Sequence, residues 1–265
     1  MSAAGTWRIV RLCAAQELTI AIRSRWTQGF AIVFGGIAIA IASAGSILSG
    51  DSGLQDFGRT AASLLQLVLL IVPLTALVMG VLALTPERGG AELLYAQPVR
   101  RSAVLAGTLL GLFEALASAQ AVGFGAAGLI LFWRVGNEGV TGFLFVGLTS
   151  LVLTAVFLSL AAVLSVGEIG RRRVRALARA LVVWLILALA FDLVVLGVAS
   201  FLRSGHASRL IIVSSIVNPI DAARTAALLI IEGLGAFGPA SLAFLRLTHG
   251  AAGAAAAIAM SLSLW

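Results

Sequence analysis

Five long stretches of this sequence are almost entirely apolar, and they restrict the possible fold more than any other feature. They are residues 30–48, 61–84, 102–132, 142–166 and 176–202. A membrane-spanning helix needs about 20 apolar residues, because it rises about 1.5 Å per residue through a hydrocarbon core about 30 Å thick. Hydrophobic residues make up 60% of the chain and charged residues 11%, too few charges to cover a water-soluble fold. The sequence therefore predicts an all-α protein that crosses the membrane several times.

The last quarter of the chain predicts a sixth span and an outer segment before it. Residues 251–265 are apolar but would reach only about 22 Å as a helix, so we expect a complete chain to continue beyond Trp265. Residues 203–249 contain two apolar runs, 210–217 and 225–231, on either side of Asn218-Pro219. Runs of this length are too short to cross a membrane. We therefore expect broken helices that enter the outer leaflet part-way.

The arginine residues predict the orientation of the chain. All 18 basic residues are arginine, and twelve of them would lie on one side of the predicted spans. The positive-inside rule places that side, with the N-terminus and the C-terminus, in the cytoplasm. We assign the net charge of +7 to topology and to anionic lipids, and not to nucleic-acid binding. The twelve are Arg8, Arg11, Arg23, Arg25, Arg88, Arg100, Arg101, Arg171, Arg172, Arg173, Arg175 and Arg179.

Residues 1–26 precede the first span and predict a helix that lies in the membrane interface. Apolar side chains recur at helical spacing across residues 7–22, with arginine, glutamine and glutamate at the polar positions. An ordinary juxtamembrane helix is the alternative, and it differs little in structure. Trp26 marks the entry into the first span, since tryptophan favours the headgroup level.

The residue types present leave little room for catalysis by this chain. Without lysine it has neither a phosphate-binding P-loop nor Schiff-base chemistry. One cysteine, Cys13, and two histidines, His206 and His249, make a poor set of zinc ligands. The sequence also lacks the GxSxG and HExxH motifs. We therefore expect no catalytic residue, metal site or cofactor in this chain, and an intramembrane enzyme is the weakest functional class.

The loop at 85–101 is the first candidate functional segment. It reads TPERGGAELLYAQPVRR, in which Gly89-Gly90 bends the chain and Pro98 ends a short stretch that carries Leu93 and Leu94. A short, partly apolar helix on the cytoplasmic side suits insertion into a groove on a partner protein. The alternative is a helix that lies on the membrane domain of its own chain.

Acidic residues within predicted spans are the second candidate site. Asp192 lies in the fifth span and Glu114 in the third, and we expect both to lie near the middle of the membrane. A charge near the middle of the membrane costs about 2.5–3.5 kcal/mol. We therefore expect both carboxyl groups to face the interior of the bundle, where Gln66 and Gln120 could join them along a polar path. The alternative is a hydrogen bond that only holds helices together.

Four segments of the chain together carry a resemblance to a known family. They are QELTIAIRSRW at 16–26, ERGGAELLYAQPVRRSAVLAG at 87–107, ALARALVVWLILALAFDLVVLG at 176–197 and NPIDAAR at 218–224. With the interfacial helix and the broken outer helices, they resemble the ABC-2 type transporter permeases, the membrane subunits of type V ABC systems. Within that family they look closest to the permeases of nitrous-oxide-reductase maturation.

The resemblance implies partners and site residues. Such permeases work as dimers with two cytosolic ATPase subunits, which bind ATP and Mg²⁺, in the bacterial cytoplasmic membrane. A periplasmic partner would dock on the outer helices at 203–249, with Asn218, Pro219, Asp221 and Arg224 as its contacts. The loop at 85–101 would be the coupling helix seated on the ATPase, with Glu87, Arg88, Glu92, Leu93, Leu94 and Pro98 as its contacts.

The resemblance also leaves two functions open. In the first, ATP hydrolysis drives transport across the membrane and serves copper-site assembly in a periplasmic reductase. In the second, the same energy moves the outer helices to act on a periplasmic protein, and no solute crosses. A polar interior cavity would favour transport, whereas a dry interior with an elaborated outer face would favour transmission of movement.

Overall fold

The computed structural model describes residues 3–48, 53–85, 100–135, 140–165, 173–231 and 251–265, and every regular element in these ranges is helical. Long apolar runs favour helices because an α-helix bonds its backbone groups within one segment. In chain order the elements are α1 (Ala3–Arg23), α2 (Arg25–Leu48), α3 (Gly53–Leu84), α5 (Arg101–Val135), α6 (Val140–Ser165), α7 (Arg173–Leu185), the π-helical turn η1 (Ile186–Ala190), α8 (Phe191–Ser200), α9 (Ser204–Val217), α10 (Pro219–Ile231) and α12 (Ala251–Leu264).

In the part of the chain that the structure describes, five stretches of helix are long and apolar enough to cross a membrane, and they match the five predicted spans. They are Arg25–Ala44, Thr60–Leu84, Arg101–Trp133, Gly142–Ser165 and Arg173–Ser200. The predicted break in the helices before the last span is also present, since α9 and α10 meet at a bend of 102°. Counting this bent pair as one span gives up to six. The span predicted at 251–265 is the helix α12, whose 14 residues are fewer than a full span needs.

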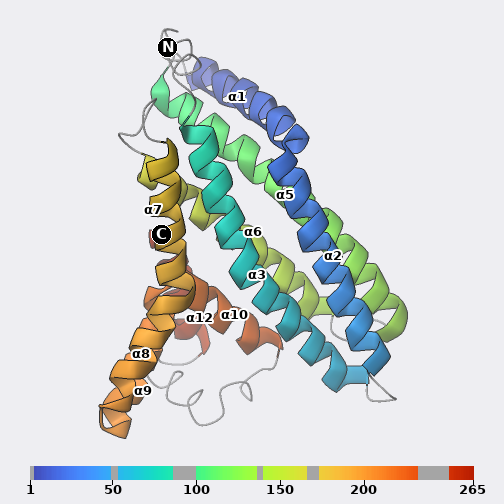
Figure 1. The fold of residues 1–265 in the computed structure, drawn as a ribbon, viewed down its shortest axis with the longest axis vertical. Coiled ribbons are helices and arrows are strands. Elements are labelled where there is room, and N and C mark those ends of the chain that lie inside the picture. The colour runs from blue at the N-terminus through green and yellow to red at the C-terminus, as the bar shows by residue number, and fades with distance from the viewer. Residues whose placement is uncertain (1–2, 49–52, 86–99, 136–139, 166–172, 232–250) are drawn as a thin grey trace.

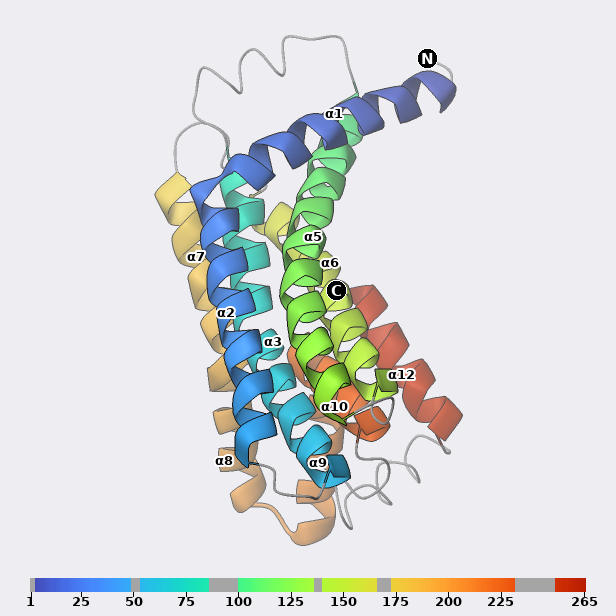
Figure 2. The same cartoon turned by 90° about the vertical axis from the view of Figure 1, so that its right-hand side faces the viewer.

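The spans alternate in direction, and four of them form the centre of the bundle (Figure 1). α2, α3, α5 and α6 pack against one another, α7 lies against α3, and α10 packs against α3 and α6. α1 lies across one end of the bundle at a steep angle to α2 (Figure 2). We call this the α1 end. α3 finishes there, and α5 and α7 begin there, whereas α8 and α9 lie at the opposite end.

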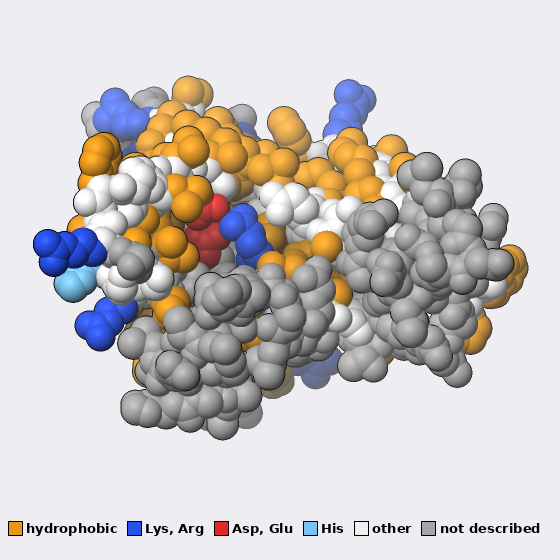
Figure 3. Space-filling model, turned by 90° about the horizontal axis from the view of Figure 1, so that it is seen from below, with side chains coloured by type: hydrophobic (Ala, Val, Ile, Leu, Met, Phe, Trp, Pro, Cys, Tyr) orange, Lys and Arg blue, Asp and Glu red, His pale blue; other side chains and the backbone are white. Residues whose placement is uncertain are grey.

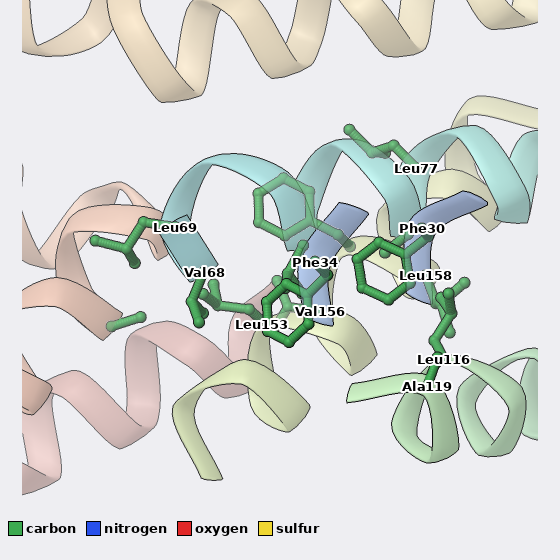
Figure 4. Close-up of a cluster of buried hydrophobic side chains, with 14 of the residues drawn as sticks. Phe30, Phe34, Val68, Leu69, Leu77, Leu116, Ala119, Leu153, Val156 and Leu158 are labelled. Carbon is green, nitrogen blue, oxygen red and sulfur yellow. The ribbon is translucent and has the colours of Figure 1, made fainter. Parts of the chain in front are cut away.

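Aromatic side chains organise the core where α2, α5 and α6 meet. Phe30 stacks on Phe34 with ring centroids 5.3 Å apart, and Phe34 meets Phe124 edge-on at 5.2 Å. Phe143 extends this series of rings from Phe124 at 5.7 Å. Buried leucine and valine side chains of α3 and α6 surround the phenylalanines of α2 (Figure 4). Each aromatic pair contributes about 0.5–1.5 kcal/mol beyond its buried area, so the rings help to fix the relative positions of three helices.

α1 packs closely on α5 because two glycines leave no side chain at the crossing. A Cβ atom on Gly107 would lie 2.5 Å from Cys13 Cβ. One turn further on, a Cβ atom on Gly111 would overlap the Ala14 carbonyl oxygen and lie 2.8 Å from Glu17 Cβ. The two glycines have the GxxxG spacing that lets membrane helices approach closely. Burial at this contact raises the pKa of the Glu17 carboxyl above its ordinary value.

The Gly111→Ala substitution is expected to loosen α1 from α5 and to lower the unfolding temperature in detergent micelles. The new methyl group would meet a backbone oxygen that cannot rotate away, and overpacking of this kind costs about 1–3 kcal/mol. Gly125→Ala is the matched control on the same helix, because nothing lies within 4 Å of its added Cβ. Helix propensity should leave this control neutral or slightly stabilised. Equal unfolding temperatures for the two variants would contradict the close crossing.

Candidate functional site

The fifth span contains an irregular turn next to the outer helices. This turn, η1, is π-helical and separates α7 from α8. In an α-helix, the N–H group of Phe191 would bond to the carbonyl of Leu187, four residues back. Here it bonds to the carbonyl of Ile186 instead. The Leu187 carbonyl is therefore released from this bond and can accept one from another donor.

Asn218 supplies that donor from the joint between α9 and α10. Its Nδ2 atom lies 2.8 Å from the Leu187 carbonyl oxygen and also donates to Asp221 Oδ2 at 2.8 Å. Its Oδ1 atom accepts a hydrogen bond of 3.1 Å from the N–H group of Ile220, which caps the start of α10. The residue is 1% exposed. Both ends of the buried amide are thus hydrogen-bonded, as burial requires.

Arg224 connects α10 to the fifth span a second time. Its Nη1 atom lies 3.1 Å from Asp192 Oδ2 on α8 and 2.9 Å from Asp221 Oδ1 on α10. A single guanidinium group therefore balances carboxylates from two helices. We call the four side chains Asp192, Asn218, Asp221 and Arg224 the outer cluster.

Asp192 and Arg224 of the outer cluster lie at the side of the bundle, whereas Asn218 and Asp221 are buried. The side chains of Asp192 and Arg224 are 36% and 30% exposed. Viewed from the end opposite α1, acidic and basic atoms lie side by side within a largely hydrophobic surface (Figure 3). Asp192 lies about 12 Å along the helix from Ser200, where α8 ends, and so nearer to that end than the predicted middle of the span.

The other polar residues predicted to gather inside the bundle lie apart from Asp192. Glu114 and Gln66 are exposed on α5 and α3, so the prediction that Glu114 faces the interior is wrong for the single chain. Gln120 is buried, donates to Thr154 Oγ1 at 2.8 Å and accepts from Ser150 Oγ at 2.6 Å. Its hydrogen bonds hold α5 to α6, which is the alternative that the sequence left open.

The structure places the predicted outer contact residues inside the chain. Asn218, Pro219 and Asp221 are buried, and Arg224 is partly buried. Their side chains therefore serve contacts within the protein, and contact with an outer partner stays a prediction for the surface around them. Arg209 on α9 is an exposed part of that surface.

The predicted coupling residues lie outside the described residues, but the helices on either side of them are described. α3 ends at Leu84 and α5 begins at Arg101, both at the α1 end. The coupling residues are Glu87, Arg88, Glu92, Leu93, Leu94 and Pro98.

Among the described residues, no group of three or more His, Cys, Asp and Glu side chains could hold a metal ion. Exposed arginines at or near the α1 end are Arg8, Arg11, Arg23, Arg25, Arg100, Arg101, Arg173, Arg175 and Arg179.

These features define a multi-pass α-helical membrane protein with a helix across one end and a bent helix pair towards the other. Residues 12–265 match the protein family described as ABC-2 family transporter protein. The chain therefore belongs to the ABC-2 family of transporter permeases, and the resemblance seen in its sequence is confirmed.

Two relatives are similar to this chain over most of their length. The "Probable ABC transporter permease protein NosY" of Stutzerimonas stutzeri is 34% identical over 237 residues, which cover 86% of this chain and 83% of the relative. The protein of the same name from Pseudomonas aeruginosa is 33% identical over 224 residues, which cover 82% and 80%. The chain is thus a NosY-like permease of an ABC transporter.

A double-mutant cycle on Asp192→Asn and Arg224→Gln is expected to give a coupling energy of about 0.5–3 kcal/mol. Arg224→Gln leaves two carboxylates without their cation, so it should be the more destabilising single change. Neutralising Asp192 as well relieves part of that loss. Unfolding in detergent micelles measures the cycle, with Arg209→Gln on α9 as the exposed control. Losses that simply add would show that the two residues do not interact.

Proposed function

We propose that this permease converts ATP hydrolysis by a separate cytosolic ATPase into movement of its membrane spans. The family match over residues 12–265 is the observation that carries the proposal. The chain has no lysine, so the P-loop that binds ATP and Mg²⁺ belongs to the partner subunit. The permease itself contributes no catalytic residue.

The ATPase binds the loop at 85–101, which acts as the coupling helix. The positions of the flanking helices support this role, because α3 and α5 both meet the loop at the α1 end and both belong to the centre of the bundle. A movement of the loop therefore acts directly on α3 and α5. α1 follows α5, since Gly107 and Gly111 hold the two helices in close contact.

The α1 end faces the cytoplasm in this proposal. The exposed arginines at that end support the assignment through the positive-inside rule. α1 also exposes large apolar side chains, among them Trp7 and Leu12, beside Arg8 and Arg11. Such a surface suits the interface of the bacterial cytoplasmic membrane, where arginine meets anionic lipid headgroups.

The permease works as a homodimer, and the fifth span supplies the contact with the second copy. In the most apolar stretch of this span no residue is buried, whereas 33–50% of the residues are buried in the corresponding stretches of the other four spans. Lipid covers apolar side chains well, but it covers the partly exposed Asp192 and Arg224 at a considerable cost. A second copy lying over this face would shield both charges.

The biological role that we propose is transport for the copper-site maturation of nitrous oxide reductase. Its support is the similarity to the two proteins named NosY and the four sequence segments that resemble that branch of the family. A periplasmic partner protein would meet the permease on the outer helices of 203–249.

The second candidate function is mechanical transmission to that periplasmic partner without transport of a solute. The packing of the described helices favours it, because the Gln120 side chain inside the bundle is hydrogen-bonded to Ser150 and Thr154 and the surrounding core is apolar. The outer helices, in contrast, are firmly joined to the fifth span through the outer cluster.

Replacing Leu93 and Leu94 together by alanine is expected to uncouple the ATPase from the permease. The two side chains would no longer fill the groove on the ATPase. The measurement is the ATPase activity of the purified complex in lipid nanodiscs, compared with that of the isolated ATPase.

The matched control replaces Leu129 and Leu144, which are exposed on α5 and α6 towards the opposite end, by alanine. This control should keep the activity of the unmodified complex. If the Leu93/Leu94 variant keeps it as well, the loop at 85–101 is not the coupling element.

A further inference from the structure

The released carbonyl of Leu187 has two possible donors, and each belongs to a different shape of the fifth span. With η1 in its π-helical form, Phe191 bonds to Ile186 and Asn218 bonds to Leu187. If the turn became α-helical, the N–H group of Phe191 would take the Leu187 carbonyl. Asn218 would then compete with Phe191 for that carbonyl and, if displaced, would keep Asp221 Oδ2 as the acceptor of its Nδ2 atom. Losing a hydrogen bond is costly where water is scarce, so the form of the turn and the position of Asn218 depend on each other.

Asn218 also marks the place where α9 ends and α10 begins. It stands between α9 and α10, at the bend of 102°, and its Oδ1 atom caps α10. Asp221 holds the same amide in place through Nδ2. A residue that bonds to the fifth span, to the first turn of α10 and to its own neighbouring carboxylate cannot move independently of any of them.

The contact between Arg224 and Asp192 keeps α10 and α8 in register. Asp192 lies just after η1 on α8, and Arg224 lies in the second turn of α10. Together with the bond from Asn218 to Leu187, it gives two attachment points between the same two segments. Two attachment points resist both sliding and rotation of α10 against the fifth span, whereas a single attachment point would still allow rotation.

We infer that Asn218 positions the bent helix pair α9–α10 on the π-helical turn of the fifth span, so that a change in this turn moves the pair. None of the residues involved needs to touch a substrate, and Asn218 acts as a positioning residue. For the working transporter the inference rests on the proposed function, because ATP-driven movement of the spans would be the cause of the change.

The test measures the distance between a spin label on the fifth span, before the turn, and a spin label on α9. It uses the complete, nucleotide-free complex. Labels at Val182→Cys on α7 and Val213→Cys on α9 use exposed positions, in a Cys13→Ala background. Asn218→Ser keeps an oxygen that can cap α10 but is too short to reach Leu187. Asn218→Asp keeps the size and the cap acceptor but has no N–H group to donate. Ser215→Ala is the control, because the Ser215 hydroxyl donates to the Ile212 carbonyl within the same helix, α9.

The protein without these changes and the Ser215→Ala control should give the same narrow distribution for the distance between the two labels of one chain, which is measured in complexes that contain one labelled and one unlabelled permease copy. Asn218→Ser and Asn218→Asp should each broaden it or add a second maximum. If either variant assembles into the complex and keeps the original distribution, Asn218 does not position the pair and the inference is overturned. Because no nucleotide is present, this outcome is independent of coupling to the ATPase, which the Leu93/Leu94 variant tests separately.

Discussion

In a membrane, every backbone N–H and C=O group must find its partner within the protein, and the whole structure depends on this constraint. It makes the long apolar runs helical, and it explains the contacts wherever a helix departs from regularity. Pro73 cannot donate a backbone hydrogen bond to the Leu69 carbonyl within α3, and the neighbouring Leu70 carbonyl accepts one from Trp184 Nε1 at 3.2 Å. The π-helical turn releases the Leu187 carbonyl, and Asn218 bonds to it. At both irregular places, a side chain of another element bonds to a backbone carbonyl, so an irregular turn in one helix is accompanied by a specific contact with another.

Small residues provide the second means of joining helices. Between lipid-exposed helices there is no gain from burying apolar surface, so close packing decides the association. Gly107 and Gly111 let α1 approach α5, Gly123 lets Phe34 pack against α5, and Gly80 faces Ala161 of α6. These contacts link the helix at the α1 end to the core, while the outer cluster links the core to the bent pair at the other side. Packed helices therefore connect α3 and α5, which lie on either side of the expected coupling loop, to α10.

Much of this architecture could be predicted from the sequence, because the length of an apolar run and the position of Asn218-Pro219 are local features. All five long spans and the break between α9 and α10 were found in this way. The partners of polar residues could not be predicted, since they come from distant parts of the chain. Periodicity did not show that Gln120 bonds to α6, that Glu114 is exposed, or that Arg224 reaches Asp192. The π-helical turn lies within a uniform apolar run, and no side-chain pattern marks it. The coupling residues at 87–98 lie outside the described residues, so their role rests on the resemblance and on the two helices that flank them.

We propose that this permease draws its energy from a separate ATPase that binds the loop at 85–101. The most direct test is native mass spectrometry of the tagged chain, purified in mild detergent from membranes of cells that carry its neighbouring genes. The account predicts an assembly of two permease chains and two P-loop ATPase chains, and removal of residues 87–98 should release the ATPase while the permease dimer persists. A permease that is purified without any nucleotide-hydrolysing subunit, or an ATPase that stays bound after the loop is removed, would contradict it.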